Sequence, residues 1–479
     1  MINSLFLILF IISVTICSAQ QQEISKLLAD SSMAHASVSI SIIDAATGDM
    51  IAGNDPDRSL TQASLMKLIT TAASIELLGS DHTFKTVLAY SGTIKKSSGI
   101  LDGDIIIKGG GDPALGSEYF PAHYGNFIEK WADEISRLGI KKIKGRVVSD
   151  DSYFDYQPAP SNWTWEDIGQ YYGTGVYGVS AFDNTLKIHF KTGREGSVPL
   201  LTGIEPAGAV IEFRNYLKAW GSKDEGYVFT APYGGSGWIA GSIPCQKEDF
   251  VLKASMPDPP LLVAKTLEKK LKEADIRIDS EASATRLLPG FTPGKTTVIS
   301  EILSPPLDSV IEVINHESVN LYAETLIKEL GKKFKGEGST AAGISVILEF
   351  LHRAGIKTEG LFILDGSGLS AQDAVSSREL TMLLLHMKKY GKYFGDYYNS
   401  LPEAGVEGTL KNNFKDSVFN ARLKAKSGTM LRVKSYAGYL ITLSGKQMIF
   451  SIIVNNFEGS PAQIVPLIEE IIKSAILYR

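Results

Sequence analysis

The sequence has few cysteines, little net charge and no hydrophobic run long enough to cross a bilayer comfortably. Its 48 basic and 53 acidic residues give a formal net charge of −5, so it lacks the basic footprint of a nucleic-acid-binding protein. Of the two cysteines, Cys17 lies in the first segment and only Cys245 follows it. A mature chain with one cysteine forms no intramolecular disulfide and no thiolate zinc site. The seven histidines show no H-E-x-x-H spacing, and we expect neither a metal nor a cofactor.

The first 19 residues are predicted to be an export signal. Leu5–Cys17 is an apolar run of about 13 residues, which is short for a membrane span and matches the core of a signal peptide. The small residues Cys17 and Ala19 favour cleavage after Ala19, although no positively charged side chain precedes the run. Lipidation at Cys17, an uncleaved anchor and a buried strand stay open as alternatives. We expect an exported protein of the periplasm or cell envelope, with no integral membrane span once the signal is removed.

The remaining composition is that of a large globular protein. Hydrophobic residues make up 44% and charged residues 21% of the chain, which excludes a disordered chain, a fibrous repeat and a multi-span membrane protein. At about 150 residues per domain, the length predicts about three domains. Turn-forming sequences are dense between about residues 86 and 290, which predicts a strand-rich region of its own.

The segments on either side of this region predict a mixture of helices and strands. Alternation over Val38–Ile43 predicts a hairpin with a second short strand at Met50, and apolar spacing predicts a helix from Ala63 to Gly79. Further helices are predicted over 307–330, 339–354, 377–390 and 461–477, and two paired strands over 436–443 and 448–455.

One tetrad, Ser64-Leu65-Met66-Lys67, is the only S-x-x-K in the chain. Three residues are close to one helical turn, so the hydroxyl and the ammonium lie on the same face. A serine in the first turn has backbone N–H groups beside it that can stabilise an oxyanion. A lysine whose pKa is lowered by burial or by a second cation can accept the serine proton. On its own, the tetrad also fits a helix cap followed by a surface lysine.

A second polar element, Ser318-Val319-Asn320, lies inside a stretch with helical spacing. Residues i and i+2 do not share a helix face, so Ser318 and Asn320 reach one site only at an irregular turn or a helix junction. The triplet is common in proteins and by itself also fits the polar edge of a helix.

The third element, Lys426-Ser427-Gly428-Thr429, lies on a predicted strand before the C-terminal hairpin. Gly428 lets a ligand approach the backbone closely, and Lys426 supplies a cation. The hydroxyls of Ser427 and Thr429 can bind a carboxylate. Lys191-Thr192-Gly193 matches the same pattern, but its surroundings predict a hairpin turn and it precedes Ser318.

Taken in this order, the three elements resemble those of the penicillin-recognising serine acyl-transferases, in which S-x-x-K supplies the nucleophile. The 254 positions from Ser64 to Ser318 leave room for a large insert. This arrangement is similar to the D-alanyl-D-alanine carboxypeptidase/endopeptidase family typified by penicillin-binding protein 4, peptidase family S13. Ser427 stands where threonine is more usual and keeps the hydroxyl. Three further segments also resemble the family, namely Gly109–Leu115, Ser318–Glu324 and Asp365–Ser370.

The resemblance covers the mature chain and implies an α/β (α+β) fold. A β-lactamase/transpeptidase-like domain, an antiparallel sheet flanked by helices, is expected to be interrupted by a large strand-rich insert. The implied boundaries are residues 1–19 for the signal, 20–85 with 291–479 for the catalytic domain, and 86–290 for an insert of one or two nested domains.

The resemblance also implies how the acylating residues act. Ser64 attacks the carbonyl between two D-alanines with Lys67 as the general base, and the backbone N–H groups of Ser64 and Thr429 form the oxyanion hole. Lys67 and Lys426 are expected to lower each other's pKa because they face one site, which favours a neutral Lys67.

Further roles concern the leaving group and the substrate. The resemblance implies that Ser318 relays a proton to the leaving amine, that Asn320 holds the substrate amide, and that Lys426 stands beside the relay. Asp150, at the end of a strand, is similar to a family position that contacts the distal amine of the stem peptide's diamino acid. Asp151 is an alternative for this role, and a turn aspartate without a binding role is another. The terminal carboxylate is expected to bind at Lys426, Ser427, Gly428 and Thr429.

The implied function is that of a serine DD-peptidase acting on peptidoglycan stem peptides, with β-lactam antibiotics as covalent inhibitors. Whether it trims terminal D-alanine or cuts crosslinks stays open, as does the formation of a homodimer. A β-lactamase or a D-amino-acid esterase or amidase on the same scaffold is the enzymatic alternative. A catalytically silent cell-wall binding protein is the non-enzymatic alternative.

Overall fold

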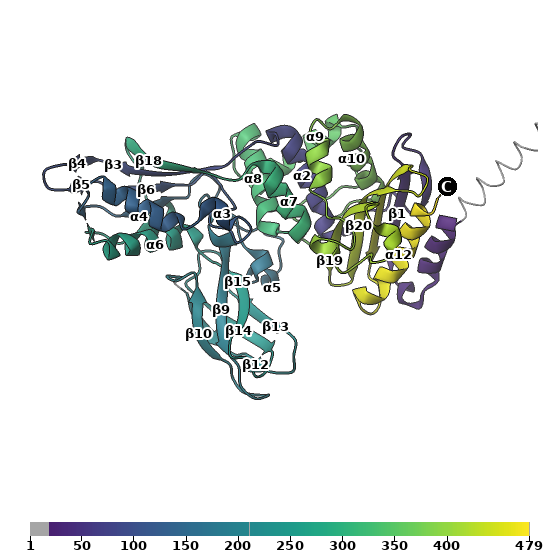
Figure 1. The fold of residues 1–479 in the computed structure, drawn as a ribbon, viewed down its shortest axis with the longest axis horizontal. Coiled ribbons are helices and arrows are strands. Elements are labelled where there is room, and N and C mark those ends of the chain that lie inside the picture. Colours follow the sequence, from purple (N-terminus) through teal and green to yellow (C-terminus); the bar gives the residue numbers. More distant parts are fainter. Residues whose placement is uncertain (1–18, 210, 479) are drawn as a thin grey trace, which may run out of the picture. The chain divides into compact units, whose positions relative to one another are not determined.

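The computed structural model describes residues 19–209 and 211–478, so the predicted signal peptide, apart from Ala19, lies outside the described residues. Within these ranges no helix combines the length and apolar character that crossing a membrane requires. The chain forms two compact units (Figure 1). The first contains the residues up to Asp81, Leu307–Val319 and the residues from Thr340 on; the second contains His82–Pro306 and Asn320–Ser339.

The first unit is built on a five-stranded antiparallel sheet in the order β19-β20-β21-β1-β2. The predicted hairpin is confirmed, with Ile40 of β1 opposite Asn54 of β2. The two predicted C-terminal strands are confirmed to within three residues at each end. The strands are β1 (Ser37–Asp44), β2 (Met50–Asn54), β19 (Leu423–Met430), β20 (Val433–Ile441) and β21 (Gln447–Asn455).

Helices cover both faces of this sheet, which explains why its central strands are apolar almost throughout. Ile40 and Ile42 share one hydrophobic core with a helix over 19–29 and with α12 (Pro461–Ile476). The alternate residues of β1 meet α10 (Ser377–Tyr390), where the hydroxyls of Ser41 and Thr381 are 2.9 Å apart. The other helices of this unit are α2 (Met66–Leu78), α7 (Leu307–Glu317), α9 (Thr340–Arg353) and α11 (Phe394–Asn399).

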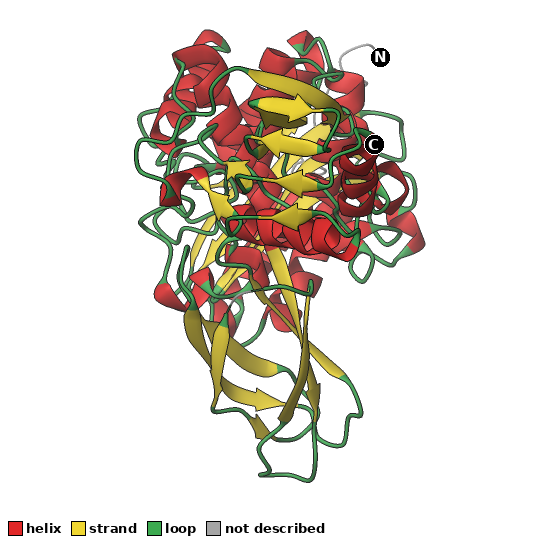
Figure 2. Cartoon of the chain, turned by 90° about the vertical axis from the view of Figure 1, so that its left-hand side faces the viewer, coloured by secondary structure: helices red, strands yellow, loops and turns green. Residues whose placement is uncertain are grey.

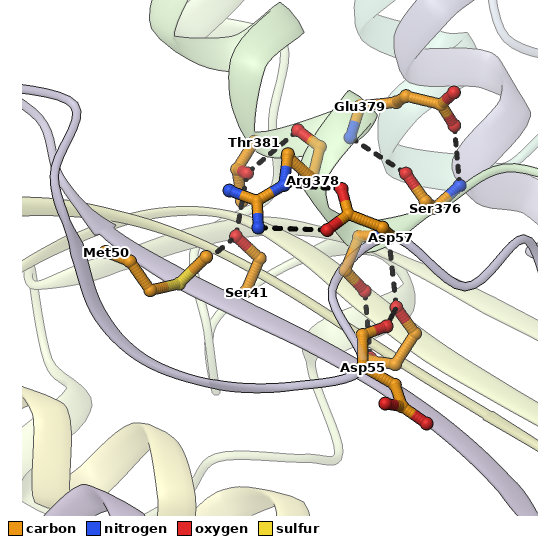
Figure 3. A network of polar contacts seen from close by, with 10 residues as sticks. Ser41, Met50, Asp55, Asp57, Ser376, Arg378, Glu379 and Thr381 are labelled. Atoms are coloured by element: carbon orange, nitrogen blue, oxygen red, sulfur yellow. Dashed lines mark hydrogen bonds and ion pairs between the residues drawn. The ribbon is translucent and has the colours of Figure 1, made fainter. Parts of the chain in front are cut away.

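Helix α10 begins with the capping arrangement that its sequence predicts. Ser376 Oγ accepts a hydrogen bond from the Glu379 N–H at 3.2 Å, and the Ser376 N–H donates to Glu379 Oε2 at 2.7 Å (Figure 3). In the next position Arg378 donates through two nitrogens to the carboxylate of Asp57. These contacts fix the helix start against the segment that follows β2.

Replacing the capping serine is expected to destabilise this unit. Ser376→Ala leaves the Glu379 N–H without its acceptor and should cost about 1 kcal/mol. For a unit of this size we expect the midpoint of thermal unfolding to fall by about 2–4 °C. Ser376→Thr keeps the acceptor and serves as the control. A Ser376→Ala midpoint equal to that of wild type would show that the cap contributes nothing.

The second unit contains four sheets, and the strand-rich character predicted for residues 86–290 is confirmed. A five-stranded sheet has the order β17-β8-β6-β3-β18, and a four-stranded sheet has the order β16-β7-β5-β4. Helices α4 (Phe127–Arg137) and α6 (Pro259–Glu273) pack on each other, and α6 packs on β8. These strands are β3 (Lys85–Ser91), β4 (Thr93–Lys95), β5 (Ile100–Asp102), β6 (Ile105–Lys108), β7 (Lys142–Ile143), β8 (Val147–Asp150), β16 (Arg277–Ile278), β17 (Ser283–Ala284) and β18 (Thr296–Leu303).

The other two sheets of this unit form a part made almost wholly of strands, seen at the bottom of Figures 1 and 2. Their shared core includes Ile188, Phe190 and Ile239. The Lys191-Thr192-Gly193 pattern begins at the last residue of β9 and leads into the turn at Glu195 and Gly196, in agreement with the turn context that its surroundings predict. The strands are β9 (Thr185–Lys191), β10 (Leu200–Glu205), β11 (Glu212–Asn215), β12 (Lys218–Ala219), β13 (Glu225–Phe229), β14 (Ser236–Ile243) and β15 (Phe250–Ser255).

The helical stretch predicted over 307–330 is interrupted at Ser318 and Val319, and its second half, α8 (Asn320–Lys335), belongs to the second unit. Lys328 is buried in α8, and its Nζ donates to Asp155 Oδ1 at 2.5 Å and to the Gln157 carbonyl at 2.7 Å. A buried ammonium requires such partners, so these bonds hold the helix in the second unit.

Candidate active site

Ser64 and Lys67 lie at the start of α2 in the first unit. The predicted helix does not begin as an α-helix at Ala63: Ala63–Leu65 form a 3-10 turn, and α2 starts at Met66. Ala63 has a φ of 50°, a strained value for a residue with a side chain, and such strain is often found at functional sites. Lys67 is fully buried, and its Nζ donates a 3.1 Å hydrogen bond to Ser64 Oγ. Ser64 itself is partly exposed, so its hydroxyl is accessible while its lysine partner is not.

The loop over 365–370 holds Lys67 from the other side. Lys67 Nζ donates to the Ser367 carbonyl at 2.8 Å. Asp365 shapes the loop, since its carboxylate accepts hydrogen bonds from the N–H groups of Ser367, Gly368 and Ser370. Gly368 has a φ of 75°, and a Cβ there would lie 2.0 Å from the Ala63 carbonyl oxygen. The Asp-Gly-Ser-Gly segment therefore forms the loop whose Ser367 carbonyl binds Lys67.

Ser318 pairs with the second lysine. It has a φ of 61° and lies between the end of α7 and the start of α8, at the kind of helix junction that its spacing requires. Lys426 Nζ donates to Ser318 Oγ at 2.9 Å and to the Ser427 carbonyl at 3.0 Å. Lys426 is fully buried on β19, whereas Ser318 is partly exposed. The first unit thus contains two pairs of an accessible hydroxyl and a buried amine.

Strand β19 passes next to the backbone of Ser64. A Cβ on Gly428 would lie 2.3 Å from Ser435 Oγ, 2.6 Å from the Gln62 carbonyl oxygen and 3.1 Å from the Ser64 nitrogen. Only glycine permits this approach. Thr429, the next residue, is exposed. The approach supports the prediction that the N–H groups of Ser64 and Thr429 serve one oxyanion.

Gly428→Ala is expected to impair acylation strongly because the new methyl group meets backbone atoms that cannot move away. Pushing β19 from Ser64 by a few tenths of an ångström should lower the second-order rate of benzylpenicillin acylation at least 100-fold. The overpacking should also lower stability by about 1–3 kcal/mol. Stopped-flow acylation and thermal unfolding measure the two effects, and an unchanged acylation rate would refute the close approach.

Two polar residues at the site were not found in the sequence. Thr409 Oγ1 accepts a 2.9 Å hydrogen bond from Ser427 Oγ. Lys434, on β20, donates a 2.8 Å hydrogen bond from Nζ to Thr429 Oγ1. Thr409 lies in no motif. Lys434 lies two residues before the strand predicted over 436–443, and β20 begins earlier, at Val433, so the sequence did not mark it as a strand residue.

Comparison with known proteins identifies the family. The model of the D-Ala-D-Ala carboxypeptidase 3 (S13) family matches residues 20–466. The chain belongs to this family. The predicted family is therefore confirmed, and the protein is a serine-type D-Ala-D-Ala carboxypeptidase hydrolase of the penicillin-binding, peptidoglycan-hydrolysing class.

Individual S13 relatives span nearly the whole chain. The D-alanyl-D-alanine carboxypeptidase of Actinomadura sp. (strain R39) is 28% identical over 458 residues, which cover 92% of this chain and 82% of that protein. The crystal structure of penicillin binding protein 4 from Haemophilus influenzae has a TM-score of 0.81 at 20% identity and covers 95% of this chain and 99% of that one. A second structure of that protein, complexed with a β-lactam, has a TM-score of 0.75 at 19% identity and covers 93% of this chain and 97% of that one. The mixed α/β fold predicted from the motifs is confirmed by this similarity.

Burial lowers the pKa of two lysines of this S13 enzyme, and for one of them neighbouring positive charges lower it further. Burial first, and then the charges of Lys67 and Lys434, lower the pKa of Lys426 well below its ordinary value. Burial alone lowers the pKa of Lys434 to about 8. The expected mutual effect of Lys67 and Lys426 is therefore present on the Lys426 side, since the charge of Lys67 contributes to the lowered pKa of Lys426.

The two remaining predicted residues, Asn320 and Asp150, belong to the second unit. Asn320 Nδ2 donates to the Tyr172 carbonyl at 2.7 Å. Asp150 ends β8, and its Oδ1 accepts a 2.6 Å hydrogen bond from Ser152 Oγ. Both carboxylate oxygens of the neighbouring Asp151 are buried without a hydrogen bond among the described residues, and burial raises the pKa of this group to about 6. The choice between the two aspartates stays a prediction.

Proposed function

We propose that this S13 enzyme cleaves the peptide bond that follows a D-alanine in peptidoglycan stem peptides, through an acyl-enzyme on Ser64. The observation that carries the proposal is the 3.1 Å hydrogen bond between the partly exposed Ser64 hydroxyl and the fully buried Lys67 amine. An accessible nucleophile joined to a desolvated base is the arrangement that serine acyl transfer needs.

In the acylation step, neutral Lys67 accepts the Ser64 proton as Oγ attacks the D-alanine carbonyl carbon. The carbonyl oxygen gains a negative charge and is stabilised by the N–H groups of Ser64 and Thr429. When the tetrahedral intermediate collapses, the C–N bond breaks and the leaving amine needs one proton. Ser318, hydrogen bonded to Lys426, delivers it and takes a proton from Lys426 in return. The proton that Lys67 took from Ser64 then replaces the one lost by Lys426, so both lysines return to their starting state. Water then attacks the ester and releases the shortened peptide.

The other predicted residues are proposed to bind the substrate. The leaving residue carries an α-carboxylate, which meets Lys426, Gly428 and the hydroxyls of Ser427 and Thr429. Asn320 holds the amide on the acyl side. Asp150 or Asp151 binds the distal amine of the diamino acid in the stem peptide. The β-lactam in the complex of the Haemophilus influenzae relative supports covalent inhibition of this chain by β-lactams.

The same substrate supports export as the location. Peptidoglycan lies outside the cytoplasmic membrane, and residues 1–19 have the composition of a signal peptide. We infer that the enzyme acts in the periplasm or elsewhere in the cell envelope.

Incubation with purified crosslinked muropeptides tests this function. Loss of one D-alanine from uncrosslinked stems would establish carboxypeptidase action, and conversion of dimers to monomers would establish endopeptidase action. Either product supports the proposal. Absence of both, together with rapid turnover of benzylpenicillin, would instead establish a β-lactamase, and absence of all three activities would favour a silent binding protein.

A further inference from the structure

Lys434 is a buried lysine of the first unit that none of the sequence motifs contains. It lies directly opposite Thr429 in the β19–β20 register. Its Nζ donates a 2.8 Å hydrogen bond to Thr429 Oγ1 and lies 4.6 Å from the centre of the Tyr436 ring. Only 6% of Lys434 is exposed, whereas Thr429 is exposed. A buried ammonium therefore contacts, from inside the protein, a hydroxyl that solvent and ligands can reach.

This ammonium has no counter-ion among the residues that the structure describes. Among residues 19–209 and 211–478, no carboxylate forms an ion pair with Lys434 or with its neighbour Lys426. Burying a cation without an anion costs free energy, and buried lysines in proteins are normally paired. The contacts of Lys434 with the described part of the chain are a hydrogen bond to a neutral hydroxyl and the face of an aromatic ring. A cation buried on β20 without a counter-ion among the described residues indicates that the anion arrives with the ligand.

We propose that Lys434 is a specificity-determining residue that makes the enzyme prefer substrates ending in a free carboxylate; this inference rests on the function proposed above. Because Lys434 donates to Thr429 Oγ1, it uses an acceptor position of that hydroxyl and leaves its proton for an incoming acceptor. A carboxylate that accepts this proton binds a hydroxyl polarised by a cation, which favours it over a neutral carboxamide. Lys434 acts through Thr429 and is thus a positioning residue.

The charge of Lys434 also limits the pH range of this preference. Its pKa of about 8 makes it charged below that pH and neutral above it. The titratable groups around it are Lys426 on β19 and Tyr436 on β20, the latter with Glu469 of α12 nearby. Strand β21 places Val454 opposite, and the turn Ala63–Leu65 brings no titratable side chain. The preference should therefore decline as the pH rises through about 8.

The experiment measures kcat and KM for a synthetic peptide ending in D-Ala-D-Ala and for the same peptide with a carboxamide end. In Lys434→Met, the ratio of kcat/KM for the acid to kcat/KM for the amide should fall about tenfold. The fall should come from a higher KM for the acid, and kcat should stay within threefold of wild type. The matched control is Lys446→Met on the same hairpin, whose lysine also lies over a tyrosine ring but is paired with Asp44. Acylation by benzylpenicillin and by its methyl ester gives a second acid–neutral pair.

The possible outcomes distinguish failure of the Lys434 proposal from failure of the proposed DD-peptidase function. Wild type should lose the acid preference between pH 7 and 9.5, and Lys434→Met should show a low ratio at every pH. The pH series on wild type decides the question even if Lys434→Met does not fold, because a preference that is flat across this range overturns the proposal. If Lys434→Met hydrolyses the peptide with an unchanged ratio of kcat/KM for the acid to that for the amide, the Lys434 proposal is overturned and the DD-peptidase function is kept. A wild type that neither hydrolyses the peptide nor reacts with benzylpenicillin overturns both.

Discussion

Ser64→Ala is expected to lower kcat/KM for a peptide ending in D-Ala-D-Ala at least 10⁴-fold. The change removes the attacking oxygen and leaves only binding and oxyanion stabilisation, which cannot replace the nucleophile. The fold should be kept, because Ser64 is partly exposed and alanine fits the 3-10 turn. Release of D-alanine measured by a coupled assay, with the thermal unfolding midpoint recorded alongside, checks both statements.

The chain offers a matched control for this substitution. Ser74 is a buried serine of α2 whose Oγ has no hydrogen-bond partner among the described residues. Ser74→Ala should leave kcat/KM within twofold of wild type. If Ser64→Ala retained more than one hundredth of the wild-type activity, another nucleophile would have to be sought.

Lys67→Met is expected to lower the second-order rate of benzylpenicillin acylation at least 10³-fold. Methionine fills a similar volume but accepts no proton, so Ser64 would attack as a neutral hydroxyl without a base. Removing a fully buried amine should not lower the unfolding midpoint, because the cost of burying a polar group disappears with it. Rapid mixing with a labelled penicillin measures the rate.

An acylation rate within tenfold of wild type would show that Lys67 is not the base. A rate that falls together with the unfolding midpoint would indicate damage to the loop over 365–370, whose Ser367 carbonyl accepts from Lys67. Variant Asp365→Asn is informative in that case, since Asp365 supports the same loop without touching Ser64.

Short motifs allowed much of the site to be predicted. Ser64 and Lys67 are three residues apart, so local helical geometry alone brings their side chains together. The pairing of Ser318 with Lys426 spans 108 positions, and only the ordered set of motifs connected them. The C-terminal hairpin and α10 were also predictable, because strand alternation and a capping box are local signals.

What could not be predicted depends on contacts distant in sequence or on fine backbone geometry. The 3-10 turn at Ala63 lies against the loop over 365–370, where a Cβ on Gly368 would lie 2.0 Å from the Ala63 carbonyl oxygen, and this contact is distant in sequence. The role of Lys434 depends on the register that sets it opposite Thr429, and a one-residue shift would turn it to the other face of the sheet.

Mapping the site of penicillin attachment tests the central claim most directly. Wild-type protein is incubated briefly with benzylpenicillin, denatured, digested and analysed by mass spectrometry. The account predicts one penicilloyl group, located on the peptide that contains Ser64 and absent from Ser64→Ala. Attachment at Ser318 or any other residue, or no attachment at all, would contradict it.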